Sequence, residues 1–283
     1  MAPAVRLVAD STADLDRDYA RAHDVAVVPL KVIFGEETLA DGVDIDAQTF
    51  FERMTQSSVH PRTSQPTPAE FEAVFKEVAK DRSPIVCTTI SSVLSGSLNS
   101  AITARQTLGN LDLRVVDSLT AGPGHRAVVE AAVAVKERGG SVDEVLTVID
   151  EVKRTQRLIF TVETLEYLRR GGRIGGARAF LGSVLNIKPI LDVRGGKVEA
   201  LDKVRTLPRA LDRLVDEVRT AADTWGGKAR VIVAHAIRRE QAEALAERVR
   251  PYCEGEPQVM LIGPVIGCHV GPGAFGIAFH RPL

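Results

Sequence analysis

The sequence predicts an α/β fold in which an N-terminal three-layer domain with a parallel sheet precedes a C-terminal α+β domain with a mixed sheet. Short apolar runs alternate with helical patterns up to about residue 158, as in a parallel sheet with helical crossovers. After that point strand-like runs follow one another directly, and two of them flank Gly195-Gly196 as in a hairpin. We therefore expect one domain over residues 1–158 and a second over residues 159–283.

The elements of the first domain are predicted from continuous apolar runs and from helix start signals. Strands that are covered on both faces are expected at residues 5–9, 85–90 and 113–116. Helical patterns cover residues 14–22, 97–108 and 125–138. Capping boxes at Thr67 with Glu70 and at Ser141 with Glu144 mark two further helix starts. Residues 57–68 are expected to form a long loop, which in a compact domain is usually functional.

The second domain is predicted to combine a partly antiparallel sheet with two long helices. Strands are expected at residues 157–162, 187–193, 197–201, 231–234 and 259–262. Helices are expected at residues 207–222 and 239–249. The glycines of the C-terminal end either leave space beside a ligand or permit tight turns, or they belong to a strand, a bulge and a second strand without ligand contact. They are Gly267, Gly271, Gly273 and Gly276.

Composition excludes several classes of partner. Lys and Arg (36) balance Asp and Glu (37), so the net charge of −1 predicts no nucleic-acid partner and only peripheral, transient contact with a membrane. The chain has no apolar run that could span a bilayer and no signal-peptide pattern, so we expect a cytoplasmic protein. The cysteines form neither a disulfide framework nor a CxxC site, and the six histidines show no metal-ligand spacing, so we expect no bound metal.

The segment over residues 163–191 contains an arginine that follows two glycines and precedes a long apolar run. Gly171-Gly172 lets the backbone take a positive φ, and the Arg173 guanidinium suits a carboxylate or a phosphate. This pattern indicates an anion site at the mouth of an apolar cavity. The alternative is that Gly171-Gly172 only ends a helix and that Arg173 is solvated.

Small polar residues follow three predicted strands of the first domain. Because ligands bind at the carboxyl ends of parallel strands, we expect these side chains to converge on one crevice. The alternative is that the serines only cap helices. The residues are Asp10, Ser11, Thr12, Ser91, Ser92, Ser95, Ser97, Asp117 and Ser118.

Seven short motifs, in this order along the whole chain, together resemble the DegV family. They are DSTADL at residues 10–15, TSQPTP at 63–68, SSVLSGS at 91–97, VVDS at 115–118, ETLEYLRRGGRI at 163–174, NIKPIL at 186–191 and GPVIGCHVGPGAFGIAF at 263–279. Each motif alone is weak, whereas the ordered combination is highly specific.

The resemblance implies a two-domain protein that binds a long-chain fatty acid between its domains. It implies a lipid-binding subunit without catalysis or cofactor of its own, which presents the carboxylate to a separate ATP-binding subunit of a bacterial fatty acid kinase. The carboxylate-binding residues would be Thr63, Ser95, Arg173 and His269. Supporting positions would be Ser64, Ser92, Gly96, Gly172 and Gly271.

The chemistry of the four residues suits this role, because hydroxyl and imidazole donors and a guanidinium can satisfy a buried carboxylate. The histidine has a plain structural alternative, since a histidine in an apolar segment is usually buried for packing. An apolar segment near residue 180 either lines a tunnel for the acyl tail or packs in the core as an ordinary helix face. Its residues are Phe180, Leu181, Val184, Leu185 and Ile187.

A basic stripe flanks the predicted helix at residue 207: Lys203, Arg205, Arg209 and Arg213. Its ordinary explanation is a solvated helix face. The functional alternative is that Arg205 contacts the kinase subunit or the activated phosphate.

Two other classes of function stay open. Ser95 with His269 could serve a hydrolase or an acyltransferase, although the chain has no GxSxG motif and no obvious carboxylate to orient the histidine. The DegV fold is also related to the substrate-holding part of dihydroxyacetone kinases, which suggests a small-molecule kinase substrate domain. Since the chain has no GxxxxGK[ST] loop, a phosphoryl donor would arrive on a partner.

Overall fold

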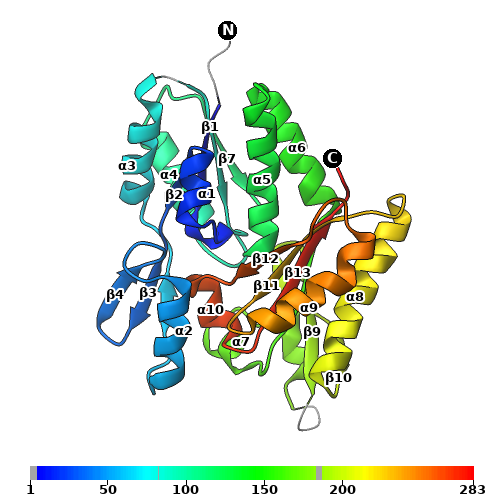
Figure 1. The fold of residues 1–283 in the computed structure, drawn as a ribbon. Helices are drawn as coiled ribbons and strands as arrows, with labels where there is room; N and C mark the ends of the chain where they lie inside the picture. Colours follow the sequence, from blue (N-terminus) through cyan, green and yellow to red (C-terminus); the bar gives the residue numbers. More distant parts are fainter. Residues whose placement is uncertain (1–4, 82, 183–186) are drawn as a thin grey trace.

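The computed structural model describes residues 5–81, 83–182 and 187–283. It contains a four-stranded sheet from the first half of the chain, a six-stranded sheet from the second half and a small three-stranded sheet beside them (Figure 1). The fold class expected from the sequence is therefore confirmed. The strand β8 (Arg157–Thr161) belongs to the six-stranded sheet, so that sheet begins next to the expected boundary at residue 158.

The four-stranded sheet is fully parallel and is covered on both faces. Its order is β2-β1-β6-β7, from β1 (Arg6–Asp10), β2 (Val25–Val28), β6 (Ile85–Thr89) and β7 (Leu113–Asp117). Successive residues of a strand point to opposite faces. Accordingly Leu7 and Ala9 pack into one core and Val8 packs into another, which explains the continuous apolar runs.

Five helices accompany this sheet: α1 (Arg17–Ala22), α3 (Pro68–Val78), α4 (Ser97–Thr107), α5 (Pro123–Glu137) and α6 (Val142–Thr155). Phe71 and Phe75 of α3 pack with α4 against one face of the sheet, while α5 packs against the other. Both predicted capping boxes are present. The first helix begins three residues later than expected, because Asp14 has a φ of +49° and cannot belong to a right-handed helix.

The six-stranded sheet has the order β10-β9-β8-β13-β11-β12 and is antiparallel except between β11 and β12. The predicted hairpin across Gly195-Gly196 joins β9 and β10. The strands after β8 are β9 (Lys188–Arg194), β10 (Lys197–Val204), β11 (Arg230–His235), β12 (Gln258–Leu261) and β13 (Phe275–His280).

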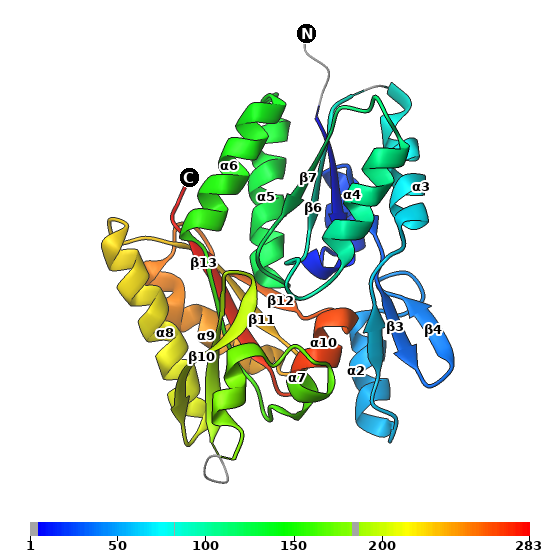
Figure 2. The same cartoon turned by 180° about the vertical axis from the view of Figure 1, so that it is seen from behind.

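Two long helices cover the outer face of this sheet and leave its inner face to the rest of the chain (Figures 1 and 2). They are α8 (Leu207–Thr224) and α9 (Arg239–Val249), which pack against Phe275, Ile277 and Phe279 of β13. The inner face joins the core that contains α5. The second half also contains the short helix α7 (Glu166–Arg170). The described residues further include four 3-10 turns: Ser11–Ala13, Ala79–Asp81, Gly175–Phe180 and Arg250–Tyr252.

The three-stranded antiparallel sheet β4-β3-β5 was missed by the sequence analysis. It is formed by β3 (Lys31–Phe34), β4 (Glu37–Ala40) and β5 (Arg62–Ser64), with α2 (Ala47–Gln56) between the last two strands. The expectation of a continuous loop over residues 57–68 is therefore wrong. A strand of three residues is too short to show an alternating pattern, and β5 is formed through its pairing with β3.

The glycine-rich end forms a helix and a strand instead of two strands around a bulge. The helix α10 (Pro264–Val270) has proline at its first position, which favours a helix start. A Cβ on Gly267 would lie 2.6 Å from Phe50 Cε1 and 2.9 Å from Phe51 Cζ, so this glycine permits α10 to pack directly on α2. Gly271 ends the helix at a φ of +76°.

We expect Gly267→Val to lower the free energy of unfolding by about 2 kcal/mol, because a side chain there must displace two buried rings. The measurement is equilibrium unfolding in urea. Ala134→Val on the exposed side of α5 is the control, with an expected loss below about 1 kcal/mol from helix propensity alone. Equal losses in the two variants would contradict close packing of α10 on α2.

Candidate functional site

A cavity of about 290 Å³ lies between the four-stranded and six-stranded sheets, at the lower end of the range for small-molecule sites. Its walls are mostly apolar and come from both halves of the chain. The first half contributes Leu30, Ile90, Leu94, Ala121 and Pro123. The second half contributes chiefly Leu158, Phe160, Leu168, Val193, Val198, Ala234, Ile262, Val265, Ile266, Val270, Ala274 and Gly276.

All four residues that the resemblance singled out line this cavity. Thr63 lies on β5 and Ser95 follows β6, whereas Arg173 follows α7 and His269 lies on α10. Each half of the chain therefore contributes two of them. All four are half-buried, so they form a polar part of the cavity wall that is partly accessible to solvent. We call these four residues the rim.

His269 is held in a neutral, hydrogen-bonded state. Its Nε2 lies 2.9 Å from Thr63 Oγ1. Burial and the neighbouring Arg173 charge lower the pKa of His269 to about 3. Its Nδ1 has no hydrogen-bond partner within the described part of the chain and faces Gly171, where a Cβ would lie 2.1 Å from Nδ1. Gly171 is therefore required for the ring to fit.

Arg173 is placed by a helix C-cap that also explains the two glycines. Gly172 N–H donates to Arg169 O at 3.1 Å and Arg173 N–H donates to Leu168 O at 3.0 Å, which is the Schellman arrangement, with Gly172 at a φ of +72°. The guanidinium then donates to Leu94 O at 3.0 Å and to Gly171 O at 2.6 Å. The cap interpretation is correct, while a freely solvated arginine is wrong.

Ser95 stands at the start of α4 and contacts its neighbour in sequence instead of the histidine. Its Oγ lies 2.9 Å from Ser97 Oγ and accepts from Ser97 N–H at 3.3 Å. Among the described residues no hydrogen bond joins Ser95 to His269, and no carboxylate orients His269 Nδ1. An imidazole with a pKa of about 3 is also a weak general base near neutral pH. This geometry does not form a Ser-His nucleophilic pair.

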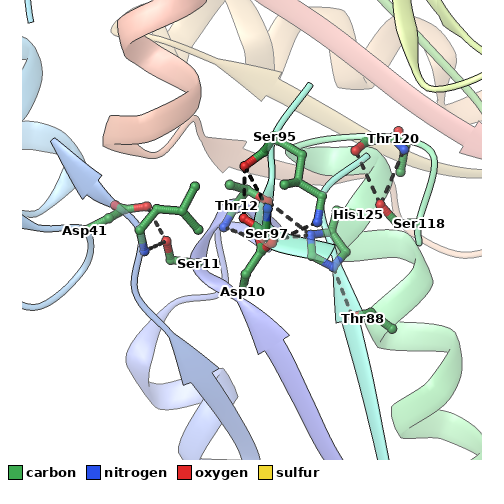
Figure 3. Close-up of polar contacts among 12 residues, drawn as sticks. Asp10, Ser11, Thr12, Asp41, Thr88, Ser95, Ser97, Ser118, Thr120 and His125 are labelled. Carbon is green, nitrogen blue, oxygen red and sulfur yellow. Dashed lines mark hydrogen bonds and ion pairs between the residues drawn. The ribbon is translucent and has the colours of Figure 1, made fainter. Parts of the chain in front are cut away.

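Several strand-end polar residues form hydrogen bonds within the protein and do not line the cavity (Figure 3). The Asp10 carboxylate accepts from Thr12 Oγ1 at 2.5 Å and from Ile90 N–H at 2.9 Å. His125 lies between Thr12 Oγ1 and Thr88 Oγ1, at 3.2 and 2.9 Å, and burial lowers its pKa. The expected convergence on one crevice is therefore wrong for this set, since only Ser95 among them lines the cavity in the described structure. Their buried network joins the ends of β1 and β6 to α5.

The proposed supporting positions have different surroundings. Ser64 lines the cavity, whereas Ser92 is exposed and does not line it in the described structure. Gly96 lies under the Gln65 side chain, which also lines the cavity and was missed by the sequence analysis although it belongs to TSQPTP. Gly172 ends α7, and Gly271 lies where a Cβ would collide with the Tyr167 ring at 2.3 Å. Arg205 is exposed between β10 and α8.

The expected tail-lining segment does not line the cavity. Phe180, Leu181 and Ile187 are absent from its described walls, and Val184 and Leu185 lie outside the described residues. Phe180 instead lies beside Lys203, with the ammonium 5.8 Å from the ring centroid. Several of the apolar wall residues from the second half lie instead on strands of the six-stranded sheet. Their signal in the sequence is the alternation of small and large residues in GAFGIAF at residues 273–279.

Comparison with known proteins identifies the family. The family model described as "uncharacterised protein, DegV family" matches residues 4–281. The chain belongs to the DegV family. Protein DegV of Bacillus subtilis is 33% identical over 278 residues, which cover 97% of this chain and 98% of the relative. A DegV domain-containing protein of Streptomyces coelicolor is 36% identical, with 96% of this chain and 97% of the relative covered.

Solved DegV-family structures share the fold over nearly the whole chain. One is described as showing fatty acid binding of a DegV-family protein from Thermus thermophilus, at a TM-score of 0.91 and 33% identity, with 99% of this chain and 100% of that chain covered. Another is described as a stearic acid-binding protein from Eubacterium ventriosum, at a TM-score of 0.91 and 28% identity, with 98% of each chain covered.

Two features are absent from the described part of this DegV-family chain. None of its helices combines the length and apolarity that crossing a membrane requires. No three His, Cys, Asp or Glu side chains in that part are grouped as metal ligands. The expectation of no bound metal stays a prediction.

The pKa of His269 predicts an acid-sensitive contribution to stability. Because the pKa is lower in the folded chain (about 3) than in an unfolded chain (about 6.5), the unfolded state binds the proton first, and stability falls as the pH drops below about 6.5. Between pH 7 and 5 the unliganded protein should lose about 1–2 kcal/mol more than His269→Gln, measured by urea unfolding. If the free energy of unfolding changes equally with pH in the two proteins, the pKa of His269 is not lowered by folding.

Proposed function

We propose that this protein binds one long-chain fatty acid, with the acyl tail in the cavity and the carboxylate at the rim formed by Thr63, Ser95, Arg173 and His269. The supporting observation is that these four half-buried polar residues line a cavity whose other walls are mostly apolar. The two related proteins from Thermus thermophilus and Eubacterium ventriosum, which are described as binding a fatty acid and stearic acid, support the same ligand class.

The rim can compensate a carboxylate for its lost hydration. Arg173 supplies one positive charge, and the hydroxyls of Thr63 and Ser95 supply donors. Because His269 is neutral and its Nδ1 faces Gly171, a proton on Nε2 would be donated to Thr63 Oγ1. The Thr63 hydroxyl hydrogen is then free to point at the ligand. In this arrangement His269 orients the threonine.

The acyl tail supplies most of the affinity. Burying about fifteen methylenes at roughly 0.8 kcal/mol each gives a gross term on the order of 12 kcal/mol. The carboxylate, by contrast, loses its hydration on entering the rim, and its contacts approximately offset that loss. The rim therefore fixes the orientation and the apolar walls provide the binding energy.

The acid end of a bound fatty acid would face solvent at the rim, which suits transfer to another protein. We infer that the chain presents the carboxylate to a separate ATP-dependent fatty acid kinase subunit in the cytoplasm and performs no catalysis itself. The weak basicity of His269 and the absence of a described base beside Ser95 support a binding role. Exposed Arg205 is the residue that we assign to contact with the kinase subunit.

We expect protein purified from a bacterial host to release about one equivalent of long-chain fatty acid when it is denatured in organic solvent, as measured by mass spectrometry. After lipid removal, Arg173→Ala should bind palmitate at least about tenfold more weakly, because the carboxylate loses its charged partner. Arg170→Ala is the matched control, since Arg170 is exposed and does not line the cavity in the described structure; its affinity should be unchanged.

Other results would contradict this proposal. Absence of lipid in the extract, together with no binding of added palmitate, would refute fatty acid binding. A burst of product from an ester substrate would favour the hydrolase interpretation, and ATP turnover by the purified chain alone would favour a kinase.

The proposed contact with a kinase subunit has its own prediction. Arg205→Glu should lower turnover by an ATP-dependent fatty acid kinase subunit about tenfold, because reversing a charge at an interface places like charges together. Fatty acid binding should stay at the wild-type level, since Arg205 lies outside the cavity walls. Arg209→Glu, also exposed, is the control. Normal turnover with Arg205→Glu would remove Arg205 from the interface.

A further inference from the structure

The strand β13 has very different side chains on its two faces. Phe275, Ile277 and Phe279 fill the outer core against α8 and α9. Between these residues the inner face has only Gly276 and Ala278, while Ala274 directly precedes the strand and His280 ends it. On the neighbouring strand β11, the residue opposite Gly276 is Ala234. Small side chains at these positions leave room between the two large sheets.

The cavity ends within this inner face. Ala274 and Gly276 line it, whereas Ala278, the next residue on the same face, does not line its described walls. The side chain opposite Ala278 is Leu158 of β8, which does line the cavity. Along β13 the cavity therefore closes between residues 276 and 278, with Leu158 beside the closure.

We propose that Gly276 and Leu158 together set the length of the acyl chain that the protein accepts. This inference rests on the proposed function, because it concerns the far end of the same cavity. Gly276 leaves the last part of the cavity empty, and the Leu158 side chain closes it. Leu158 lies near the start of β8, and Thr161 is its last residue. The chain continues from Thr161 to α7 and then to Arg173 of the rim, so the closed end of the cavity lies away from the rim.

The backbone at Gly276 accepts a larger side chain. A Cβ there would lie 3.5 Å from Phe160 Cβ and 3.8 Å from Leu158 Cδ1, which are ordinary contact distances. Gly276 is also outside the left-handed region, so a substitution introduces no backbone strain. A valine at this position would therefore fit into the sheet, and its methyl groups would occupy the end of the cavity.

Selection by length follows from the affinity that each methylene provides. A methylene that is excluded from the apolar site loses its contribution, which weakens binding about fourfold. Blocking the end of the cavity should thus weaken binding of long chains progressively and leave short chains almost unaffected. Removing the Leu158 side chain should act in the opposite direction.

The test uses the delipidated full chain with dodecanoate, myristate, palmitate and stearate as probes, and measures each dissociation constant by calorimetry. Gly276→Val should weaken stearate binding about tenfold or more relative to dodecanoate. Leu158→Ala should raise the affinity for stearate relative to myristate. Gly276→Ala should weaken stearate binding relative to dodecanoate by a smaller factor. This variant keeps the test valid if Gly276→Val does not fold.

Ala278→Val is the matched control, because it places a valine on the same face of β13 outside the described cavity walls. It should lower stability without changing the ratio of affinities for long and short chains. Wild-type ratios in folded Gly276→Ala or Gly276→Val, and in Leu158→Ala, would overturn the inference while fatty acid binding itself persists. If the wild-type chain binds none of the four probes, the proposed function fails instead.

Discussion

Two hydrogen bonds at the cavity rim connect the N-terminal and C-terminal halves of the chain, and the geometry of the site depends on them. Thr63 on the small sheet contacts His269 on α10, and Arg173 donates to Leu94 O beyond β6. Each bond joins residues far apart in the sequence. A ligand at this rim therefore contacts both halves at once, and its position is defined only when the two large sheets are correctly placed. The glycines at 171 and 267 serve this placement by permitting close approach of the backbone.

Much of the fold could be predicted from the sequence, because the main elements carry strong local signals. Doubly covered strands are continuously apolar, capping boxes are explicit, and the Gly195-Gly196 hairpin has its own turn chemistry. The small sheet was missed because β5 has three residues and exists through its pairing with β3. The helix α10 was missed because glycine and proline obscured its pattern, while packing on α2 stabilises it.

The candidate site was predicted unevenly. The rim residues were found through the ordered motifs, since no local pattern shows that residues 63 and 269 meet. The expectation that strand-end residues line a ligand site was correct for Ser95. It was wrong for Asp10 and Thr12, because their side chains form hydrogen bonds in a buried network. For the apolar segment near residue 180 the sequence left tunnel lining and core packing open, and its described members do not line the cavity. The alternation of small and large residues along β13 was the better signal for the walls.

The rim members differ in how firmly their backbone is held. Arg173 follows a capped helix and His269 lies on a helix packed against α2, whereas Thr63 stands on an edge strand of three residues that pairs with β3 alone in the described structure. Local opening requires less free energy where fewer contacts are broken. Amide hydrogens of β5 should thus exchange with solvent before those of the large sheets. Separation of this one strand would uncover the cavity for a long guest molecule while the rest of the protein stays folded.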